Sequence, residues 1–407
     1  MGMAMASLHS PHRLNARDRL EREGKALNAL VALAQPQAPR EGPLSGLTFV
    51  AKDMFSWPDY EYSRGLNATV PFDGNPAFFL NQLIAEGTEL LGFAEMTPLA
   101  YEPSGANPFR GRPINPLNAD YISGGSSSGS AVLVAAGLVD FAVGSDTAGS
   151  LRIPAQCCGV TAWKPSFGLL CRGGSWPLAP SLDTLGLLAR SVEMLLRVGN
   201  AIIPPGNGQP LRMAIADDLV WQNDDRARVM AAAQDFKIST INLQSTIELC
   251  DDVVLTLLQQ EAYESNRALI GSGELDSVLE RRLSHGAAVT PAAYATALAG
   301  HAVLRAEVAE KLFDLADVIA LPVMPCATPR VAMCEPGQPE FAARHLYDLS
   351  RYTRFVNALG LPAVALPLAG NHSAMPTAVQ LIARHGTDLT ILRAAQQIET
   401  RLKGSAA

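Results

Sequence analysis

The chain has 407 residues, of which 48% are hydrophobic and 17% charged, and its formal net charge at pH 7 is -7. This composition supports a buried core and argues against extended disorder. Without a long run of Lys and Arg, the negative chain offers no cationic surface for nucleic acid or for an anionic membrane. The expected partner is therefore a small molecule or another protein. The length allows one large α/β domain or two to three domains of ordinary size.

The N-terminal residues resemble no targeting signal. They lack the charged region and the long apolar run of a secretory signal. No stretch of about 18 uninterrupted apolar residues predicts a membrane span. We therefore expect a cytoplasmic protein that does not bind a membrane, with a flexible leader over residues 1–14. The six cysteines show no Cys-x-x-Cys spacing, so we interpret them as reduced and structural.

The first third of the chain alternates helical and strand patterns. Apolar residues at near-helical spacing predict an amphipathic helix over 15–33. A short buried strand over 46–50 then places Lys52 at its end. Further along the chain, the patterns predict a helix over 75–86, a strand over 88–93, a loop over 103–118, a buried helix over 131–137 and a strand over 139–144.

The rest of the chain predicts more strands and a charged helical region. The order of strand, helix and strand favours a sheet with helices on both faces. The expected elements are a strand over 211–216, a helix-rich lobe over about 217–300, strands over 318–323 and 363–367, and a final amphipathic helix over 389–402.

Two serine-glycine runs, Gly124 to Ser130 and Gly144 to Arg152, indicate a catalytic site. Glycines let the backbone turn sharply, so that hydroxyls and N–H groups can converge on one small volume. A serine attacks only when a base takes its proton, and no histidine lies near these runs in the sequence. A buried lysine whose pKa is lowered can supply that base, and Lys52 is the candidate.

Each motif alone has another interpretation. Lys52 could lie at the surface and pair with Asp53. The run from Gly124 could hold a phosphate at a helix N-terminus, although it lacks the P-loop ending and the Gly-x-Gly-x-x-Gly spacing. Gly149-Ser150 could be a simple turn.

Together, the motifs closely resemble those of the amidase signature family of serine hydrolases, which use a Ser-Ser-Lys triad. Val50-Ala51-Lys52-Asp53 matches the lysine motif, 124–127 matches the Gly-Gly-Ser-Ser run, and 146–154 matches the Asp-Thr-Gly-Gly-Ser-Ile/Val-Arg-x-Pro run. Similar landmarks continue to residue 400. The resemblance implies one large α/β domain over 15–407, with a mixed, mostly parallel sheet flanked by helices.

The resemblance also implies a mechanism. Ser150 would attack an amide carbonyl, Ser126 would relay the proton, and neutral Lys52 would be the base. Ser127 and Ser128 are rival relays. The expected intermediate is an acyl-enzyme, which needs no metal or organic cofactor.

Further residues follow from the same motifs. The backbone N–H groups of Thr147, Ala148, Gly149 and Ser150 would form the oxyanion hole. Candidates for contacting the substrate or for holding the catalytic loops are Ser127, Asp146, Arg152 and Gln156. The pocket walls are expected from 101–109, 175–180 and 320–350.

Two positions depart from the family pattern. Ala148 replaces a glycine in the oxyanion loop, where a Cβ could disturb the geometry. The segment 92–96 reads Gly-Phe-Ala-Glu-Met where many relatives have Gly-Lys-Thr-Asn, which alters either the substrate pocket or only the packing.

The leading hypothesis is an amidase that hydrolyses a linear amide of a small molecule with water. The alternatives are the glutaminase A subunit of a tRNA-dependent amidotransferase and an inactive binding protein on the same scaffold. The oligomeric state is left open, with a homodimer among the options.

Overall fold

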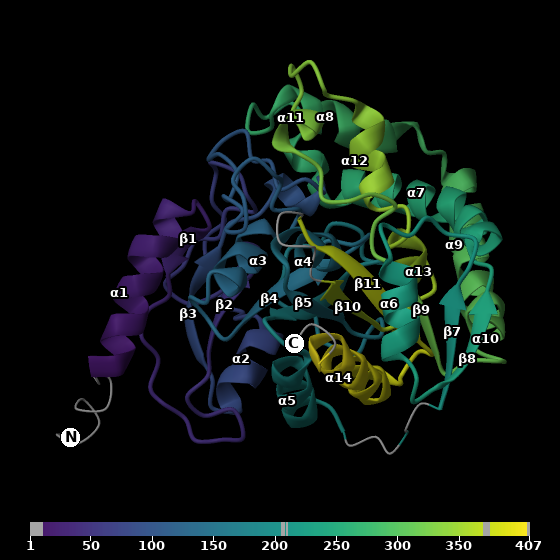
Figure 1. Ribbon diagram of the computed structural model, residues 1–407. Coiled ribbons are helices and arrows are strands. Elements are labelled where there is room, and N and C mark those ends of the chain that lie inside the picture. Colours follow the sequence, from purple (N-terminus) through teal and green to yellow (C-terminus); the bar gives the residue numbers. More distant parts are fainter. Residues whose placement is uncertain (1–10, 205–207, 209–210, 369–374, 405–407) are drawn as a thin grey trace.

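An 11-stranded sheet forms the centre of the computed structural model, which describes residues 11–204, 208, 211–368 and 375–404 (Figure 1). The strand order is β1-β3-β2-β4-β6-β5-β10-β11-β9-β7-β8. The strands are β1 (Leu30–Leu33), β2 (Thr48–Lys52), β3 (Glu89–Ala94), β4 (Phe141–Asp146), β5 (Thr161–Lys164), β6 (Thr184–Ala189), β7 (Arg212–Ala216), β8 (Lys237–Ile241), β9 (Val318–Pro322), β10 (Ala363–Leu368) and β11 (Thr377–Ala383).

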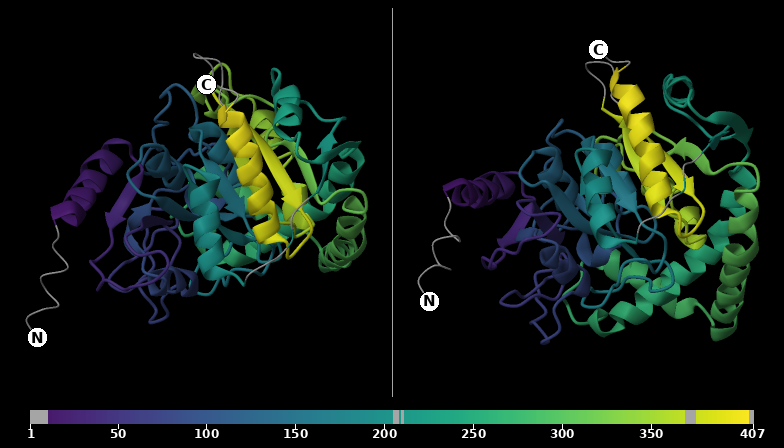
Figure 2. Two further views of the ribbon diagram at one scale, coloured as in Figure 1. Left: turned by 60° about the horizontal axis from the view of Figure 1, so that its bottom comes forward. Right: turned by 90° about the horizontal axis from the view of Figure 1, so that it is seen from below.

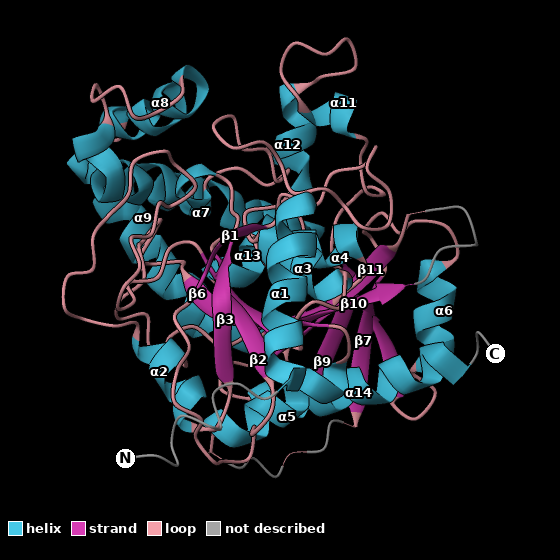
Figure 3. Cartoon of the chain, turned by 90° about the vertical axis from the view of Figure 1, so that its left-hand side faces the viewer, coloured by secondary structure: helices cyan, strands magenta, loops and turns pink. Residues whose placement is uncertain are grey.

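Helices cover both faces of this sheet (Figures 2 and 3). The α-helices are α1 (Pro11–Ala26), α2 (Phe78–Ala85), α3 (Ser128–Ala135), α4 (Arg152–Cys158), α5 (Val192–Ile202), α6 (Asp225–Ala232), α7 (Gln244–Asn266), α8 (Ser277–Ser284), α9 (Pro291–Val303), α10 (Ala309–Leu312), α11 (Val331–Cys334), α12 (Ala343–Leu349), α13 (Arg354–Ala358) and α14 (Asp388–Gly404). Short 3₁₀ helices are η1 (Pro98–Ala100), η2 (Arg267–Leu269) and η3 (His285–Ala288), and η4 (Leu304–Val308) is a π-helix.

The hydrophobic core is divided between the two faces of the sheet, because side chains alternate in direction along each strand. On β4, Phe141 and Val143 pack with α2, α5 and α14, whereas Ala142 packs with α3 and α4. Helices α7, α9 and α13 enclose a further cluster with β7 and β9. Because successive strand residues point to opposite faces, this pattern sandwiches the sheet between helical layers.

The sheet is mixed, as predicted, but the expectation of mostly parallel strands is wrong. Among the described residues, six of the ten strand pairings are antiparallel. Parallel pairs join β3, β2 and β4 at one end and β9, β7 and β8 at the other. The central strands β5 and β6 are joined without a crossover helix and run antiparallel.

The N-terminal prediction needs correction at both ends. Helix α1 ends at Ala26, and Leu30–Leu33 forms an edge strand against β3 instead of a last helical turn. Asn28 has a positive φ of 52°, which breaks the helix. Residues 1–10 of the expected leader lie outside the described residues, whereas 11–14 are helical.

The predicted helical lobe contains α6 to α9, together with strand β8, which the sequence analysis missed. Within the described residues, no single helix has the length and apolarity to cross a membrane. One bent pair, Ser277–Ala288 with Pro291–Leu312 at 89°, satisfies the criteria by length and composition alone.

Candidate active site

Lys52 stands at the end of β2, between β3 and β4, and its side chain is fully buried. Its Nζ lies 2.6 Å from Oγ of Ser126 and 2.9 Å from Oγ of Ser145. Burial lowers the pKa of Lys52 to about 7, although the charges of Asp146 and Asp183 act in the opposite direction. Near neutral pH, a large fraction of this amine is therefore unprotonated and able to accept a proton from a hydroxyl.

The alternative of a surface lysine paired with Asp53 is wrong. Asp53 instead lies 3.0 Å from the guanidinium of Arg110, which also pairs with Glu95 at 2.8 Å. Asn107 donates a further hydrogen bond to Glu95 at 3.1 Å. Glu95 belongs to the segment that departs from the family pattern, so this change lies in a buried ion-pair network.

The first serine run packs closely against its neighbours. Gly124 has a φ of 71°, and a Cβ there would lie 2.7 Å from Cα of Pro154. At Gly125, a Cβ would lie 2.7 Å from the carbonyl oxygen of Glu102. The Gly-Gly pair thus allows the turn that brings Ser126 to Lys52.

The contacts of the three neighbouring serines separate their roles. The hydroxyl of Ser127 donates to the carbonyl of Ser145 at 3.2 Å. The hydroxyl of Ser128 is buried and has no hydrogen-bond partner among the described residues. Of the three hydroxyls, only that of Ser126 bonds to Lys52, which favours Ser126 over its two rivals as the relay.

Ser150 lies on the turn between β4 and α4. Its carbonyl accepts the N–H of Ser127 at 3.2 Å, which joins the backbones of the two serine runs. Ser150 and Ala148 are partly exposed, whereas the side chains around them are buried. The serine that the resemblance identifies as the nucleophile is therefore accessible, and its backbone bonds to the run that carries Ser126.

Ala148 causes no backbone strain. It is not among the residues with positive φ, whereas Gly149 has a φ of 130°. A Cβ at Gly149 would collide with Oγ1 of Thr353. The position that requires glycine is thus Gly149, and the departure at Ala148 leaves the loop geometry intact.

The expected oxyanion hole loses one of its four donors. The N–H of Gly149 donates to Oδ1 of Asp146 at 2.8 Å and is not available to a substrate. The N–H groups of Thr147, Ala148 and Ser150 have no acceptor within the described part of the chain. Those three groups remain as candidates for binding an oxyanion.

Asp146 organises the loop that carries Ser150. Its two carboxylate oxygens lie 2.8 and 3.0 Å from the guanidinium of Arg152, and one of them accepts the N–H of Leu151 at 3.1 Å. Burial alone would raise the pKa of Asp146, but Arg152 outweighs it and lowers this pKa to about 2. Asn357 donates to the same carboxylate at 3.0 Å.

The other candidates also hold loops. Arg152 is fully buried and contacts Gln380 and Asn357 in addition to Asp146, so it cannot reach a substrate carboxylate. Gln156 is 1% exposed and donates to the carbonyl of Cys326 at 3.1 Å. Likewise, the hydroxyl of Ser127 donates to the carbonyl of Ser145 and so links the two serine runs.

Sequence reasoning missed three contributors to this site: Ser145, Thr353 and Asn357. Ser145 lies inside the second serine run, but nothing in the run distinguishes it. Thr353 binds the carbonyl of Ala148, and Asn357 binds Asp146. Both come from a segment about 200 residues away in sequence, where no local pattern indicates a role.

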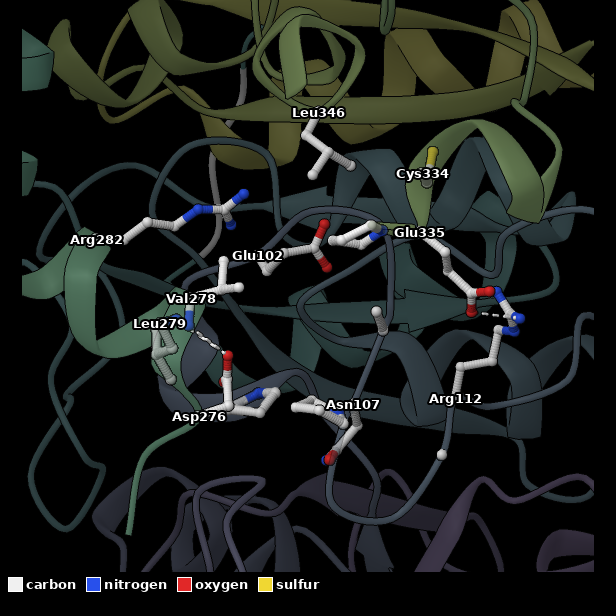
Figure 4. Close-up of a pocket in the computed structure, with 15 residues that line it drawn as sticks. Glu102, Asn107, Arg112, Asp276, Val278, Leu279, Arg282, Cys334, Glu335 and Leu346 are labelled. Atoms are coloured by element: carbon white, nitrogen blue, oxygen red, sulfur yellow. Dashed lines mark hydrogen bonds and ion pairs between the residues drawn. The ribbon is translucent and has the colours of Figure 1, made fainter. Parts of the chain in front are cut away.

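Two cavities are lined by residues of the predicted pocket walls, and the smaller one also touches the second serine run. A cavity of about 160 Å³ is lined by Ser145, Thr147, Arg172 and part of the predicted wall 175–180. A larger one, of about 510 Å³, is lined by residues of the segments 98–112, 276–282 and 334–346 (Figure 4). Two of the three predicted wall segments therefore line the larger cavity, together with α8, which was not expected there.

The family model described as Amidase matches residues 22–253 and 229–392, so the chain belongs to the amidase family. Members of this family are hydrolases that act on C–N bonds. The resemblance based on the three motifs is thereby confirmed, together with the single α/β domain built around a large sheet.

Named relatives show the range within this family. "Amidase 1" of Oryza sativa subsp. japonica is 28% identical, covering 89% of this chain and 92% of its own. AtzE of Pseudomonas sp. (strain ADP), part of a 1-carboxybiuret hydrolase, is 30% identical, covering 88% and 84%. A glutamyl-tRNA(Gln) amidotransferase subunit of Campylobacter curvus (strain 525.92) is 28% identical, covering 80% and 81%. An amidase crystal structure superposes with a TM-score of 0.82 at 26% identity, covering 95% and 94%.

Proposed function

We propose that this chain is an amidase that hydrolyses a C–N bond of a small linear amide through an acyl-enzyme on Ser150. The observation that carries this proposal is the 2.6 Å contact between the Lys52 amine and the Ser126 hydroxyl. A buried amine with a pKa of about 7 has the basicity to work near neutral pH. Membership of the amidase family supports the same chemistry.

In the first half-reaction, neutral Lys52 accepts the proton of Ser126, and Ser126 accepts that of Ser150 as Ser150 attacks the carbonyl carbon. The carbonyl oxygen becomes an anion, which the free N–H groups of Thr147, Ala148 and Ser150 stabilise. Loss of one such donor costs about 3–4 kcal/mol in comparable hydrolases. The proton then returns through Ser126 to the leaving nitrogen, so that the amine departs neutral.

In the second half-reaction, water attacks the ester formed on Ser150. The same pathway takes the water proton through Ser126 to Lys52 and returns it to Ser150 as the acid departs. One relay thus serves both steps, and the protein ends in its starting protonation state.

The second candidate function is that of a glutaminase within an amidotransferase, favoured by the likeness to the glutamyl-tRNA(Gln) enzyme of Campylobacter curvus. In that case, the isolated chain would hydrolyse amides poorly, and a partner would stimulate it. Robust turnover by the purified chain alone favours the stand-alone amidase. The third hypothesis, an inactive binding protein, was based on the alanine at position 148. Ala148 has no positive φ, so the structure gives no sign that this alanine distorts the loop.

Covalent labelling tests the proposal directly. A fluorophosphonate probe should label the wild-type protein at one site, identified by peptide mass spectrometry as Ser150. Ser150→Ala should abolish the labelling, and Ser126→Ala should slow it by at least about 100-fold, because the relay is lost. Ser128→Ala is the matched control within the same run and should label normally. A wild-type protein that neither labels nor hydrolyses any amide contradicts the proposal.

A further inference from the structure

The smaller cavity, of about 160 Å³, adjoins the loop that carries the proposed nucleophile. Its wall includes Ser145, whose hydroxyl accepts a hydrogen bond from Nζ of Lys52 at 2.9 Å. The wall also includes Thr147, whose N–H is one of the three free donors on the turn that carries Ser150. A carbonyl oxygen bound by the N–H of Thr147 would therefore place the rest of its acyl group at this cavity.

Apolar side chains make up most of the wall of the smaller cavity. The larger ones belong to Met54, Trp176, Leu178 and Leu185. Such a wall favours the apolar atoms of a ligand, and each buried CH₂ group strengthens binding about fourfold. An apolar engineered cavity of about 150 Å³ binds benzene. The smaller cavity therefore has the size for a phenyl ring or a short alkyl chain.

Of the described residues that line the smaller cavity, the two charged ones pair with each other. The guanidinium of Arg172 lies 3.8 Å from the carboxylate of Asp183 and packs over the ring of Phe167. Asp183 also accepts the hydroxyl of Thr147 at 2.6 Å and the N–H of Leu178 at 2.9 Å. An anionic ligand would have to compete with Asp183 for Arg172, and a cationic one with Arg172 for Asp183. An uncharged acyl group leaves this pairing intact.

Trp176 has the largest side chain in this wall, and three contacts hold it. Its indole Nε1 donates to Oδ1 of Asn266 at 2.9 Å, and the guanidinium of Arg64 lies 4.7 Å from its ring centroid. Its backbone N–H donates to the carbonyl of Met54 at 2.9 Å. Met54 follows Lys52 by two residues, so this hydrogen bond ties Trp176 to the strand that positions the base. A ring with these partners has little freedom to turn away from a ligand.

We propose that the smaller cavity binds the acyl group of the substrate and that Trp176 limits its size. This chain then prefers amides whose acyl group is uncharged and no larger than about a phenyl ring. This inference rests on the proposed function. Trp176 is a specificity residue, because its indole contacts the acyl group while Ser150 attacks the carbonyl carbon. Acetamide, butyramide and benzamide belong to the preferred class, whereas an amide with a second fused ring does not.

Benzamide and 2-naphthamide measure the size limit, because they differ by one fused ring. We expect kcat/KM of the wild type for benzamide to exceed that for 2-naphthamide by about 10- to 100-fold, the effect of overfilling a packed site. Trp176→Ala opens the wall and should raise the ratio of kcat/KM for 2-naphthamide to that for benzamide by at least about tenfold. In the aliphatic series, kcat/KM should rise about fourfold per methylene from acetamide to butyramide.

Two further variants exclude simpler explanations. Trp221→Ala removes another partly exposed tryptophan, whose Nε1 donates to the carbonyl of Ala216 at 2.9 Å and which does not line this cavity. It should leave the ratio of 2-naphthamide to benzamide unchanged. Leu178→Phe adds a ring to the wall and should lower kcat/KM for benzamide relative to that for acetamide. If Trp176→Ala only loosened the fold, it would lower the turnover of both aromatic amides together, and the role of Trp176 would be overturned.

The charge preference and the proposed function have separate tests. Butyramide should exceed succinamate, its anionic match in length, and equal or faster turnover of succinamate would overturn the preference for an uncharged acyl group. A fluorophosphonate should label Ser150 in Trp176→Ala as it does in the wild type. If the wild type neither labels nor hydrolyses an amide, the proposed function itself is contradicted. If it labels at Ser150 and hydrolyses 2-naphthamide as well as benzamide, only the limit set by Trp176 is overturned.

Discussion

Lys52 and Lys164 are two fully buried lysines at the ends of two strands, β2 and β5. Burial lowers the pKa of each to about 7. Lys52 contacts the hydroxyls of Ser126 and Ser145, whereas Lys164 donates to the carbonyl of Pro165 at 2.9 Å. A carbonyl has no proton to give. A lowered pKa is therefore not enough for a general base, because the amine must also face a hydroxyl.

The two lysines also share a counter-charge. Asp146 raises the pKa of both, and Lys164 in turn helps to lower that of Asp146. Arg152 acts against Lys164 by lowering its pKa further. The carboxylate that shapes the loop of Ser150 thus lies within electrostatic reach of both amines.

The largest expected effect separates the two lysines by turnover. Lys52→Met should lower kcat by about 10²- to 10⁴-fold, the range attributed to general acid–base catalysis. Lys164→Met should stay within about threefold of wild type, because its amine contacts no hydroxyl. Steady-state hydrolysis of the best amide found, with circular dichroism to verify folding, measures both. Equal losses of kcat in the two variants would show that contact with a hydroxyl does not distinguish the two lysines.

The next effect concerns the shared carboxylate. Arg152→Met leaves Asp146 buried without its guanidinium partner, and breaking such a pair costs about 3–5 kcal/mol. Urea unfolding should show a corresponding drop in the free energy of unfolding, together with a loss of turnover as the Ser150 loop shifts. Lys25→Met, which breaks an exposed ion pair with Glu21, is the control and should change stability by less than about 1 kcal/mol. A small effect of Arg152→Met would mean that Asn357 and the backbone N–H groups suffice to hold Asp146.

Local patterns predicted most elements of the fold, and they indicated that both serine runs belong to a catalytic site. Strand β2 and helix α3 were predicted within a few residues, because their apolar residues are contiguous in sequence. The direction of strand pairing was not predictable in this way. It depends on which distant strands become neighbours, such as β5 against β10, and no local period encodes that choice.

The same limit applies to the site. The motifs singled out Lys52, Ser126 and Ser150 as candidates, because each family motif is short and continuous. Asn357 and Thr353 make their hydrogen bonds across long sequence separations, so their roles emerge only when the chain is folded. The structure was also needed to show which position of the oxyanion loop requires glycine. Gly149 has a positive φ, whereas Ala148 does not.

The pH profile gives the next smaller effect. Protonated Lys52 cannot accept a proton, so kcat/KM should fall tenfold per pH unit below the pKa of about 7 and level off above it. Lys164→Met should show the same profile, because its amine takes no part in the transfer. A profile that stays flat from about pH 5 to 9 would contradict Lys52 as the base. A profile that changes in Lys164→Met would show that the two amines are coupled through Asp146.

The smallest effect is on the pH dependence of stability. Between the folded pKa of Lys164, about 7, and its ordinary value of 10.5, the unfolded chain holds a proton that the folded chain has lost. Stability therefore rises with pH across this window and is lost as pH falls through it, by up to about 1.4 kcal/mol per pH unit for one lysine. Lys164→Met should reduce the slope of the unfolding free energy, measured in urea from about pH 7.5 to 9.5, by nearly that amount. Lys52→Met should reduce it equally, since burial lowers both pKa values alike, whereas Lys25→Met, at an exposed site, should not. If both variants reduce the slope of the unfolding free energy equally but only Lys52→Met loses turnover, the cost of burying an amine is separate from its use in catalysis. If the slope is unchanged in Lys164→Met, the amine of Lys164 stays protonated in the folded chain, and the two lysines are alike only in being buried.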